Sequence, residues 1–199
     1  MLIDTEHLHH WMQAIRQSNN PMRTMDAFWS GQIKSKEWLI DNLTHYVTEP
    51  VTIDIHGGWV GVLASMLFQS NIPVTSIRSI DIDPLCQHTS TTMNQMEAHN
   101  GRFRAITSNM TDIRSDADII VNTSCEHITQ DDYELWLSGI PHNSIIVLQS
   151  NNYIIPEHIR PVNSLEEFIS QSDIKVLTSS QLALPLYTRY MLIGTKNGQ

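Results

Sequence analysis

The chain has 199 residues, of which 41% are hydrophobic and 17% are charged, and its formal net charge is −9 with its ten histidines counted as neutral. This composition is typical of one globular domain with a small appendage, and the acidic balance disfavours a nucleic-acid substrate, which usually requires a basic face. No apolar run approaches the roughly 20 residues of a membrane span, and the N-terminus lacks a signal-peptide pattern. We therefore expect a cytoplasmic protein without a membrane partner.

The first 47 residues read as a helical cap, and we place a domain boundary after them. Apolar side chains at helical spacing predict a helix over residues 2–15. An Asn-Asn-Pro breaker at residues 19–21 follows it. Ser35 is expected to be the N-cap of a second helix over residues 36–46, after an interruption at Gly31.

Metal-ligating side chains gather near the N-terminus, at Glu6, His7, His9 and His10. Two of the histidines can share a helix face, but no further ligand stands at a spacing that completes a metal site. We therefore interpret this group as a solvated helix end and predict no metal. Two distant cysteines do not make a disulfide framework, so we expect reduced thiols at Cys86 and Cys125.

Residues 51–67 read as a strand, a glycine turn and a helix, which is the first half of a βαβ unit. β-Branched residues at 51–55 favour a buried strand. Gly57 and Gly58 then allow positive φ and a close approach of a ligand to the backbone. From Val60 the apolar spacing lengthens to a helical period.

Six further strands are expected, at residues 74–83, 102–108, 117–122, 144–149, 175–179 and 187–195. Helices are predicted at residues 85–99, with Asp83 as a cap, and at 131–137 and 164–169. About eight residues separate the last two strands, too few for a helical crossover, so these strands are expected to be antiparallel. The predicted fold class is α/β: a Rossmann-like three-layer sandwich with a mostly parallel seven-stranded sheet, an antiparallel final strand and N-terminal helices.

Acidic residues flank the glycine turn at the edge where such sheets bind their ligands, the carboxyl ends of the strands. Asp81 lies 24 positions after Gly57, close to the spacing at which an acid meets ribose hydroxyls in these folds. Asp54 precedes the glycines, where it disfavours a pyrophosphate and can position a cationic group. Because a strict G-x-G-x-x-G is also missing, the pattern favours a cationic nucleoside over NAD.

These residues resemble motifs of the class I S-adenosylmethionine-dependent methyltransferases. Residues 54–61 (DIHGGWVG) are similar to the glycine-rich first motif of that family, 80–84 (IDIDP) to its acidic second motif, and 122–127 (NTSCEH) to its fourth motif. The NTSCEH stretch and the LQSNNY stretch at 148–153 are also similar to small methyltransferase-like proteins known from phage and environmental sequences. The fourth motif differs from the Asn-Pro-Pro-Tyr type of nucleic-acid amino-methylating enzymes, which counts against that subclass.

The resemblance implies S-adenosyl-L-methionine as the cofactor of a domain spanning residues 48–199. Asp81 would hold the ribose, residues 54–58 the amino-acid end of the cofactor, and Asn109 with Met110 the adenine. The implied cofactor contacts are Asp54, His56, Gly57, Gly58, Trp59, Asp81, Ile82, Asn109, Met110 and Asn122.

Polar residues in the loops supply candidates for chemistry and substrate binding. Glu126 and His127 have pKa ranges suited to a general base, although a hydrogen-bonded loop explains them equally well. For the substrate we predict Trp29, Lys36, Gln149, Asn151 and Tyr153. The alternatives are helical packing for the first two and an Asn-rich turn for the others.

We therefore expect a methyltransferase that acts on a small molecule or a protein side chain, by in-line attack on the sulfonium methyl group, with positioning as the main source of rate. Two alternatives stay open, because fold does not determine chemistry. One is another S-adenosylmethionine-using enzyme, which cleaves the cofactor or transfers its aminocarboxypropyl group. The other is a non-catalytic cofactor-binding protein. The oligomeric state is unknown from the sequence.

Overall fold

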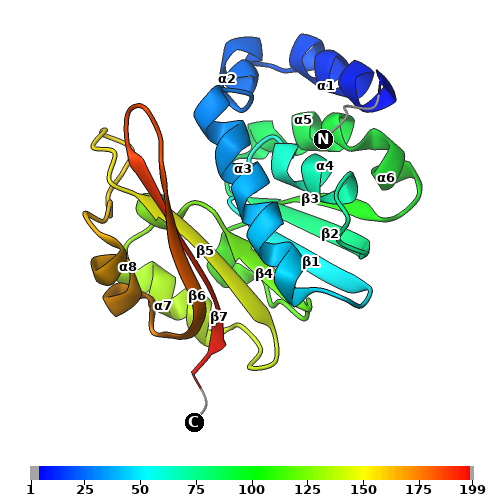
Figure 1. The fold of residues 1–199 in the computed structure, drawn as a ribbon. Coiled ribbons are helices and arrows are strands. Elements are labelled where there is room, and N and C mark those ends of the chain that lie inside the picture. Colours follow the sequence, from blue (N-terminus) through cyan, green and yellow to red (C-terminus); the bar gives the residue numbers. More distant parts are fainter. Residues whose placement is uncertain (1–4, 198–199) are drawn as a thin grey trace. The chain divides into compact units, whose positions relative to one another are not determined.

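The computed structural model describes residues 5–197, and the chain forms two compact units, Met1–Asn109 and Met110–Gln199 (Figure 1). We call them the N-terminal unit and the C-terminal unit. The predicted cap of residues 1–47 falls in the same unit as the first three strands. The compact units thus divide the chain at a different place from the predicted domain boundary. Within the described residues, no helix combines the length and the apolar character needed to cross a membrane.

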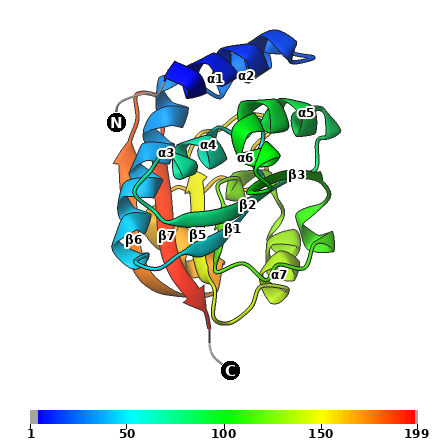
Figure 2. The ribbon, with the colours of Figure 1, turned by 90° about the vertical axis from the view of Figure 1, so that its right-hand side faces the viewer.

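The N-terminal unit is a three-stranded parallel sheet with helices packed on it. Its strands are hydrogen-bonded in the order β3-β2-β1 and are β1 (Val51–His56), β2 (Val74–Asp81) and β3 (Phe103–Thr107). Its helical elements are α1 (Thr5–Gln17), α2 (Pro21–Asp26), α3 (Ser30–Leu43), η1 (Thr44–Tyr46), α4 (Val62–Phe68), α5 (Pro84–Met93) and α6 (Gln95–His99). Ile53, Ile55 and Ile77 are almost fully buried, as expected for β-branched residues of a covered sheet. Figure 2 shows α1 and α2 across the outer side of the helices that cover these strands.

The C-terminal unit contains the reversed strand. Its strands are hydrogen-bonded in the order β4-β5-β7-β6 and are β4 (Ile119–Asn122), β5 (Ile145–Asn151), β6 (Ile174–Ala183) and β7 (Thr188–Lys196). β4 and β5 are parallel, whereas β7 is antiparallel to both of its neighbours. The helical elements are η2 (Met110–Asp112), η3 (Cys125–His127), α7 (Gln130–Ser138) and α8 (Leu165–Ser172). Tyr133, Trp136 and Phe168 pack into the core of this unit.

The predicted fold class is confirmed. The seven strands make a mixed, mostly parallel sheet with helices around it, and the final strand is the antiparallel one. Both cysteines are buried free thiols, as predicted. The Asp83 cap is also confirmed, because its carboxylate accepts a hydrogen bond from the N–H of Leu85 at the start of α5.

Two predicted helices have the wrong boundaries. α3 begins at Ser30 and runs through Gly31, so Ser35 is not an N-cap; its hydroxyl donates to the Gly31 carbonyl oxygen inside the helix. The predicted helix over residues 85–99 is divided at Asn94. The buried Asn94 amide donates to the Gly61 carbonyl oxygen, a tertiary contact that local spacing does not reveal.

Candidate functional site

The turn after β1 has an unusual backbone, supported by β2. Gly57, Trp59 and Gly61 have φ angles of +69°, +48° and +83°. A left-handed conformation costs a residue with a side chain roughly 1–2 kcal/mol, so Trp59 needs an external support. Its N–H donates to Oδ2 of Asp81 over 2.8 Å. A Cβ added to Gly58 would lie 2.0 Å from the Ser79 Oγ, so only the main chain fits against β2 here.

Asp81 is held in place by two backbone N–H groups at the end of β2. Its Oδ2 accepts from Trp59, and its Oδ1 accepts from the N–H of Asp83 over 3.0 Å. Each carboxylate oxygen can accept a further hydrogen bond, and the half-buried side chain leaves room for it. The next residue, Ile82, is 69% exposed. A fixed acid beside an apolar surface suits a nucleoside, with the acid on the diol and the apolar side chain on the base.

Asp54, a predicted cofactor contact, is paired with an arginine of the neighbouring strand. It is 1% exposed on β1, and Arg78 on β2 binds both of its oxygens, with Nε on Oδ1 at 2.7 Å and Nη2 on Oδ2 at 2.5 Å. The parallel register places the two residues opposite each other. A ligand cation would have to displace the guanidinium, so the geometry argues against Asp54 as a direct cofactor contact.

His56 ends β1 and is 1% exposed. Burial lowers its pKa to about 4; the carboxylate of Asp54 opposes this shift, and the guanidinium of Arg78 adds to it. The imidazole is therefore neutral at neutral pH. With so little exposed surface, its side chain has little access to a ligand.

The other predicted residues of the N-terminal unit lie at its surface. Asn109 is exposed after β3, and Trp29 is 65% exposed just before α3. The ammonium of Lys36 donates to the side-chain oxygen of Gln32 over 3.0 Å, one turn back along α3. These contacts neither place Trp29 and Lys36 in a substrate pocket nor assign them to the core, so their role stays a prediction.

Glu126 lies at the centre of a buried network in the C-terminal unit. It is 2% exposed, and its Oε1 accepts from Asn151 Nδ2 at 2.5 Å and from Arg189 Nη1 at 2.9 Å. Arg189 also donates to the Thr123 carbonyl oxygen at 2.5 Å and to Gln149 Oε1 at 3.4 Å. The buried side chain has little access to a substrate proton, so the geometry argues against the predicted general base at Glu126.

His127 is exposed beside Glu126, and a second histidine approaches it. The ring centroids of His127 and His158 are 4.7 Å apart. Tyr153 is near the same pair, with its ring 6.2 Å from that of His158 and 5.5 Å from that of Tyr187. Of the two predicted candidates for a general base, only His127 has the required access to solvent.

Three predicted residues of the C-terminal unit are buried by their own contacts. Asn122 is fully buried: its Oδ1 accepts from the N–H of Ser124 at 2.9 Å, and its amide contacts the Met110 sulfur at 3.7 Å. Gln149 is 1% exposed beside the Met191 sulfur. The network around Glu126 buries Asn151. The side chains of Asn122, Gln149 and Asn151 are therefore engaged inside their unit, which argues against direct side-chain contacts with a ligand.

Three residues of these networks, Arg78, Arg189 and His158, are not among the site residues predicted from the sequence. Strand register carries a signal for two of them, since Arg78 lies opposite Asp54 and Arg189 lies opposite Asn151. His158 follows β5 in an irregular segment, and no sequence pattern points to it.

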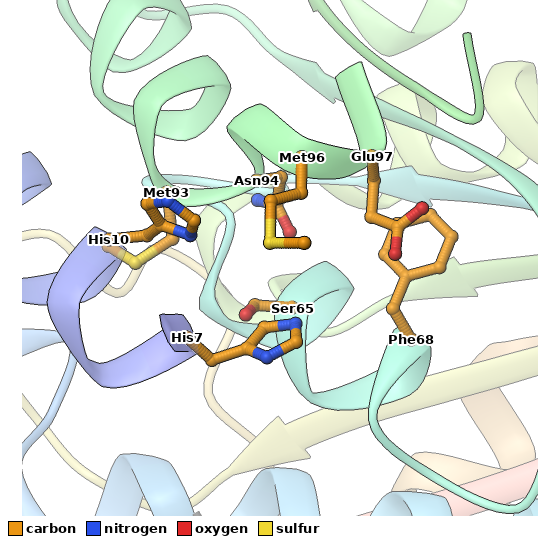
Figure 3. Close-up of a pocket in the computed structure, with 8 residues that line it drawn as sticks. All are labelled: His7, His10, Ser65, Phe68, Met93, Asn94, Met96 and Glu97. Atoms are coloured by element: carbon orange, nitrogen blue, oxygen red, sulfur yellow. The ribbon is translucent and has the colours of Figure 1, made fainter. Parts of the chain in front are cut away.

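A small hollow lies among the helices of the N-terminal unit (Figure 3). Its lining comes from α1, α4, α5 and α6 and from the residue between the last two, and consists of His7, His10, Ser65, Phe68, Met93, Asn94, Met96 and Glu97. Two of the predicted solvated histidines thus face other helices. Within the described residues, the N-terminal histidines and Glu6 do not form a cluster of three metal-ligating groups.

Comparison with known proteins identifies the fold. No family model matches the chain, and no curated protein matches its sequence. Among solved structures, magnesium protoporphyrin IX methyltransferase from Synechocystis PCC 6803 with bound SAH is similar, with a TM-score of 0.66, 9% identity and coverage of 97% of this chain and 95% of that one. Geranyl diphosphate C-methyltransferase from Streptomyces coelicolor A3(2) has a TM-score of 0.65 and 10% identity over 83% of this chain and 76% of that one.

A third similar structure is MtNAS in complex with MTA and tNA, with a TM-score of 0.63 and 12% identity over 96% of this chain and 70% of that one. At such low identity these likenesses show the fold alone. The chain has the fold of the class I methyltransferases.

Proposed function

We propose that the protein is an S-adenosylmethionine-dependent enzyme that binds the nucleoside of its cofactor at Asp81 and transfers the methyl group to a small molecule or a protein side chain. The observation that carries the proposal is the carboxylate of Asp81, fixed by the N–H groups of Trp59 and Asp83 beside the exposed Ile82. The fold supports it, because a similar methyltransferase structure holds SAH.

The residues of the N-terminal unit fit the proposed cofactor by their chemistry. Asp81 has acceptor capacity for two ribose hydroxyls, and a carboxylate there repels a phosphate. Ile82 offers an apolar surface to the adenine, and Asn109 an amide in the next loop. The main chain of Gly57 and Gly58 offers the close approach that the amino-acid end needs.

When bound, the cofactor supplies an activated methyl group on its sulfonium. The contribution of the protein is to position that group for in-line attack and to exclude water. His127 is the candidate base for an acceptor that must lose a proton. We assign no cofactor contact to Asp54, because Arg78 holds both of its oxygens.

Calorimetric titration with S-adenosylmethionine tests the binding step. We expect Asp81→Asn to weaken binding at least about 10-fold, equivalent to ~1.4 kcal/mol, because one diol acceptor is lost. Asp26→Asn is the matched control, an exposed acid in the same unit, and should bind like the wild type. Absence of binding by the wild-type protein would refute the proposal.

Product analysis tests the reaction. Incubation with the cofactor and a panel of small molecules and peptides should release S-adenosylhomocysteine. Release of methylthioadenosine instead would favour aminocarboxypropyl transfer or cofactor cleavage. The likeness to MtNAS, which was crystallised with MTA, is the reason to test this second candidate. Binding without turnover on any acceptor would favour a cofactor-binding protein.

A further inference from the structure

The C-terminal unit contains a cluster of three metal-ligating side chains, Glu126, His127 and His158. One ligand atom from each lies within 4.8 Å of the others. Ligands of one zinc ion stand about 2.0–2.2 Å from the metal, so these three atoms would have to move closer together to share one ion. From this geometry and the observations below, we propose that Glu126, His127 and His158 form a binding site for a divalent transition-metal ion. This site does not require the proposed cofactor, and a metal ion on Nε2 of His127 would exclude the role of general base that is proposed above for that residue.

Both histidines are oriented by backbone carbonyl groups. Nδ1 of His127 lies 3.0 Å from the Glu157 carbonyl oxygen, and Nδ1 of His158 lies 2.7 Å from the Tyr153 carbonyl oxygen. A carbonyl oxygen can only accept, so each neutral ring carries its proton on Nδ1 and keeps the lone pair on Nε2. Metal-ligating histidines in proteins almost always have such a partner on their other nitrogen.

The buried carboxylate of Glu126 provides an independent observation. Its Oε1 accepts from Asn151 and Arg189, but its Oε2 is buried and has no hydrogen-bond partner among residues 5–197. A buried charged oxygen without a partner is costly. A cation bound by the two histidines would satisfy it if it also reached Oε2.

The two loops that carry the ligands are tied to each other before any metal binds. The N–H of Arg160 donates to the Glu126 carbonyl oxygen over 3.0 Å, and its guanidinium donates to the Cys125 carbonyl oxygen over 3.2 Å. The same guanidinium lies 4.7 Å above the ring of Tyr133. The segment that presents His158 is therefore fixed against the η3 turn that presents Glu126 and His127.

The ligand types indicate which ions fit. Two imidazoles and one carboxylate suit zinc and its first-row neighbours, whereas calcium and magnesium prefer oxygen ligands. Arg189 offsets part of the carboxylate charge, which further disfavours a hard cation held by charge alone. Three protein ligands leave at least one position for water or substrate, and the exposure of His127 puts that position within reach of solvent.

The test is a zinc titration of the full-length protein, in which magnesium should not compete. We expect one strong zinc site in the wild type, weakened at least about 10-fold in His127→Ala and in His158→Ala. His142→Ala, an exposed histidine of the same unit, is the matched control and should bind like the wild type. Zinc should also raise the melting temperature of the wild type, because a ligand of the folded state stabilises it.

Two further results would overturn the proposal. The first is equal zinc affinity in the wild type and the His127→Ala/His158→Ala double variant, which would place binding at other histidines. The second is no measurable zinc binding by the wild type. Glu126→Gln risks misfolding because it removes the partner of Arg189, so the histidine variants carry the test, with circular dichroism as the check of folding.

Discussion

Asp54 in the N-terminal unit and Glu126 in the C-terminal unit are both almost fully buried, and each is paired with an arginine. They differ in the number of oxygens that the protein satisfies. Arg78 takes both oxygens of Asp54, whereas Arg189 and Asn151 share one oxygen of Glu126 and leave Oε2 without a partner among the described residues. A fully satisfied acid holds strands together, whereas a half-satisfied one can bind something further.

Three acid–arginine pairs differ in how far their side chains are exposed to solvent. Both side chains of Arg189 and Glu126 are buried, at 7% and 3% exposed; Arg78 is 34% exposed over a buried Asp54; Arg23 and Asp83 are 42% and 27% exposed. Removing one partner costs more as the other is more deeply buried, because water cannot replace the lost contact. The predictions below test this order, from the largest expected effect to the smallest.

Arg189→Met should lower the free energy of unfolding by about 3–5 kcal/mol, the usual cost of an uncompensated buried charge. Urea denaturation followed by circular dichroism measures it. Arg189→Lys keeps the positive charge but cannot make the several hydrogen bonds of the guanidinium, so it should lower the free energy of unfolding less than Arg189→Met does. A loss below about 1 kcal/mol in Arg189→Met would mean that water reaches Glu126.

Acid should destabilise the protein through His56, the neighbour of Asp54. Its folded-state pKa of about 4 is below the ordinary 6.5, so the unfolded chain binds the proton first. Stability is therefore lost as the pH falls from 6.5 to 4, by about 3 kcal/mol from this group. Denaturation at several pH values should show this slope reduced in His56→Gln, and an unchanged slope would contradict burial of the neutral ring.

Arg78→Met should lower the free energy of unfolding by about 1–3 kcal/mol, a value between the ranges for surface and buried ion pairs. The reason is that water reaches the guanidinium but not Asp54. The second variant Asp54→Asn should cost a similar amount. If Asp54 were instead a cofactor contact, Arg78→Met would free it and strengthen S-adenosylmethionine binding. We expect no such gain in calorimetry.

Arg23→Met should lower the free energy of unfolding by less than about 1 kcal/mol, as for other exposed pairs. Asp83 keeps its hydrogen bond from Leu85, so the start of α5 stays capped. Raising the salt concentration should remove most of the difference from the wild type, since exposed pairs are screened. A loss equal to that of Arg78→Met would show that exposure does not order these pairs.

Much of the fold can be predicted from short-range patterns. Alternation and β-branching locate the strands, and the short connection between β6 and β7 predicts their antiparallel pairing, because these signals act over a few residues. The boundaries of α3 and α5 could not be predicted in this way. Ser35 has the chemistry of a cap but lies within a helix, and Asn94 ends α5 where its amide meets Gly61.

Only part of the candidate site can be predicted from residues close together in the sequence. Asp81 and the glycine turn follow from sequence spacing, because a strand, a tight turn and a helix place them within one βαβ unit. Arg189 is 63 positions from Glu126, and the carbonyl oxygen that orients His127 is 30 positions away. No periodicity spans such separations.

The sequence by itself determined the succession of strands and helices along the chain, the glycine turn, the Asp83 cap and the position of Asp81 at the end of its strand. Each of these depends on backbone preferences and on spacing within a few tens of residues. Only the tertiary structure decided which acids are satisfied. Packing brought Arg78 to both oxygens of Asp54 and Arg189 to one oxygen of Glu126, and it placed His158 beside His127. Burial then sets the consequence, because a buried charge must be matched by whatever the fold brings within reach.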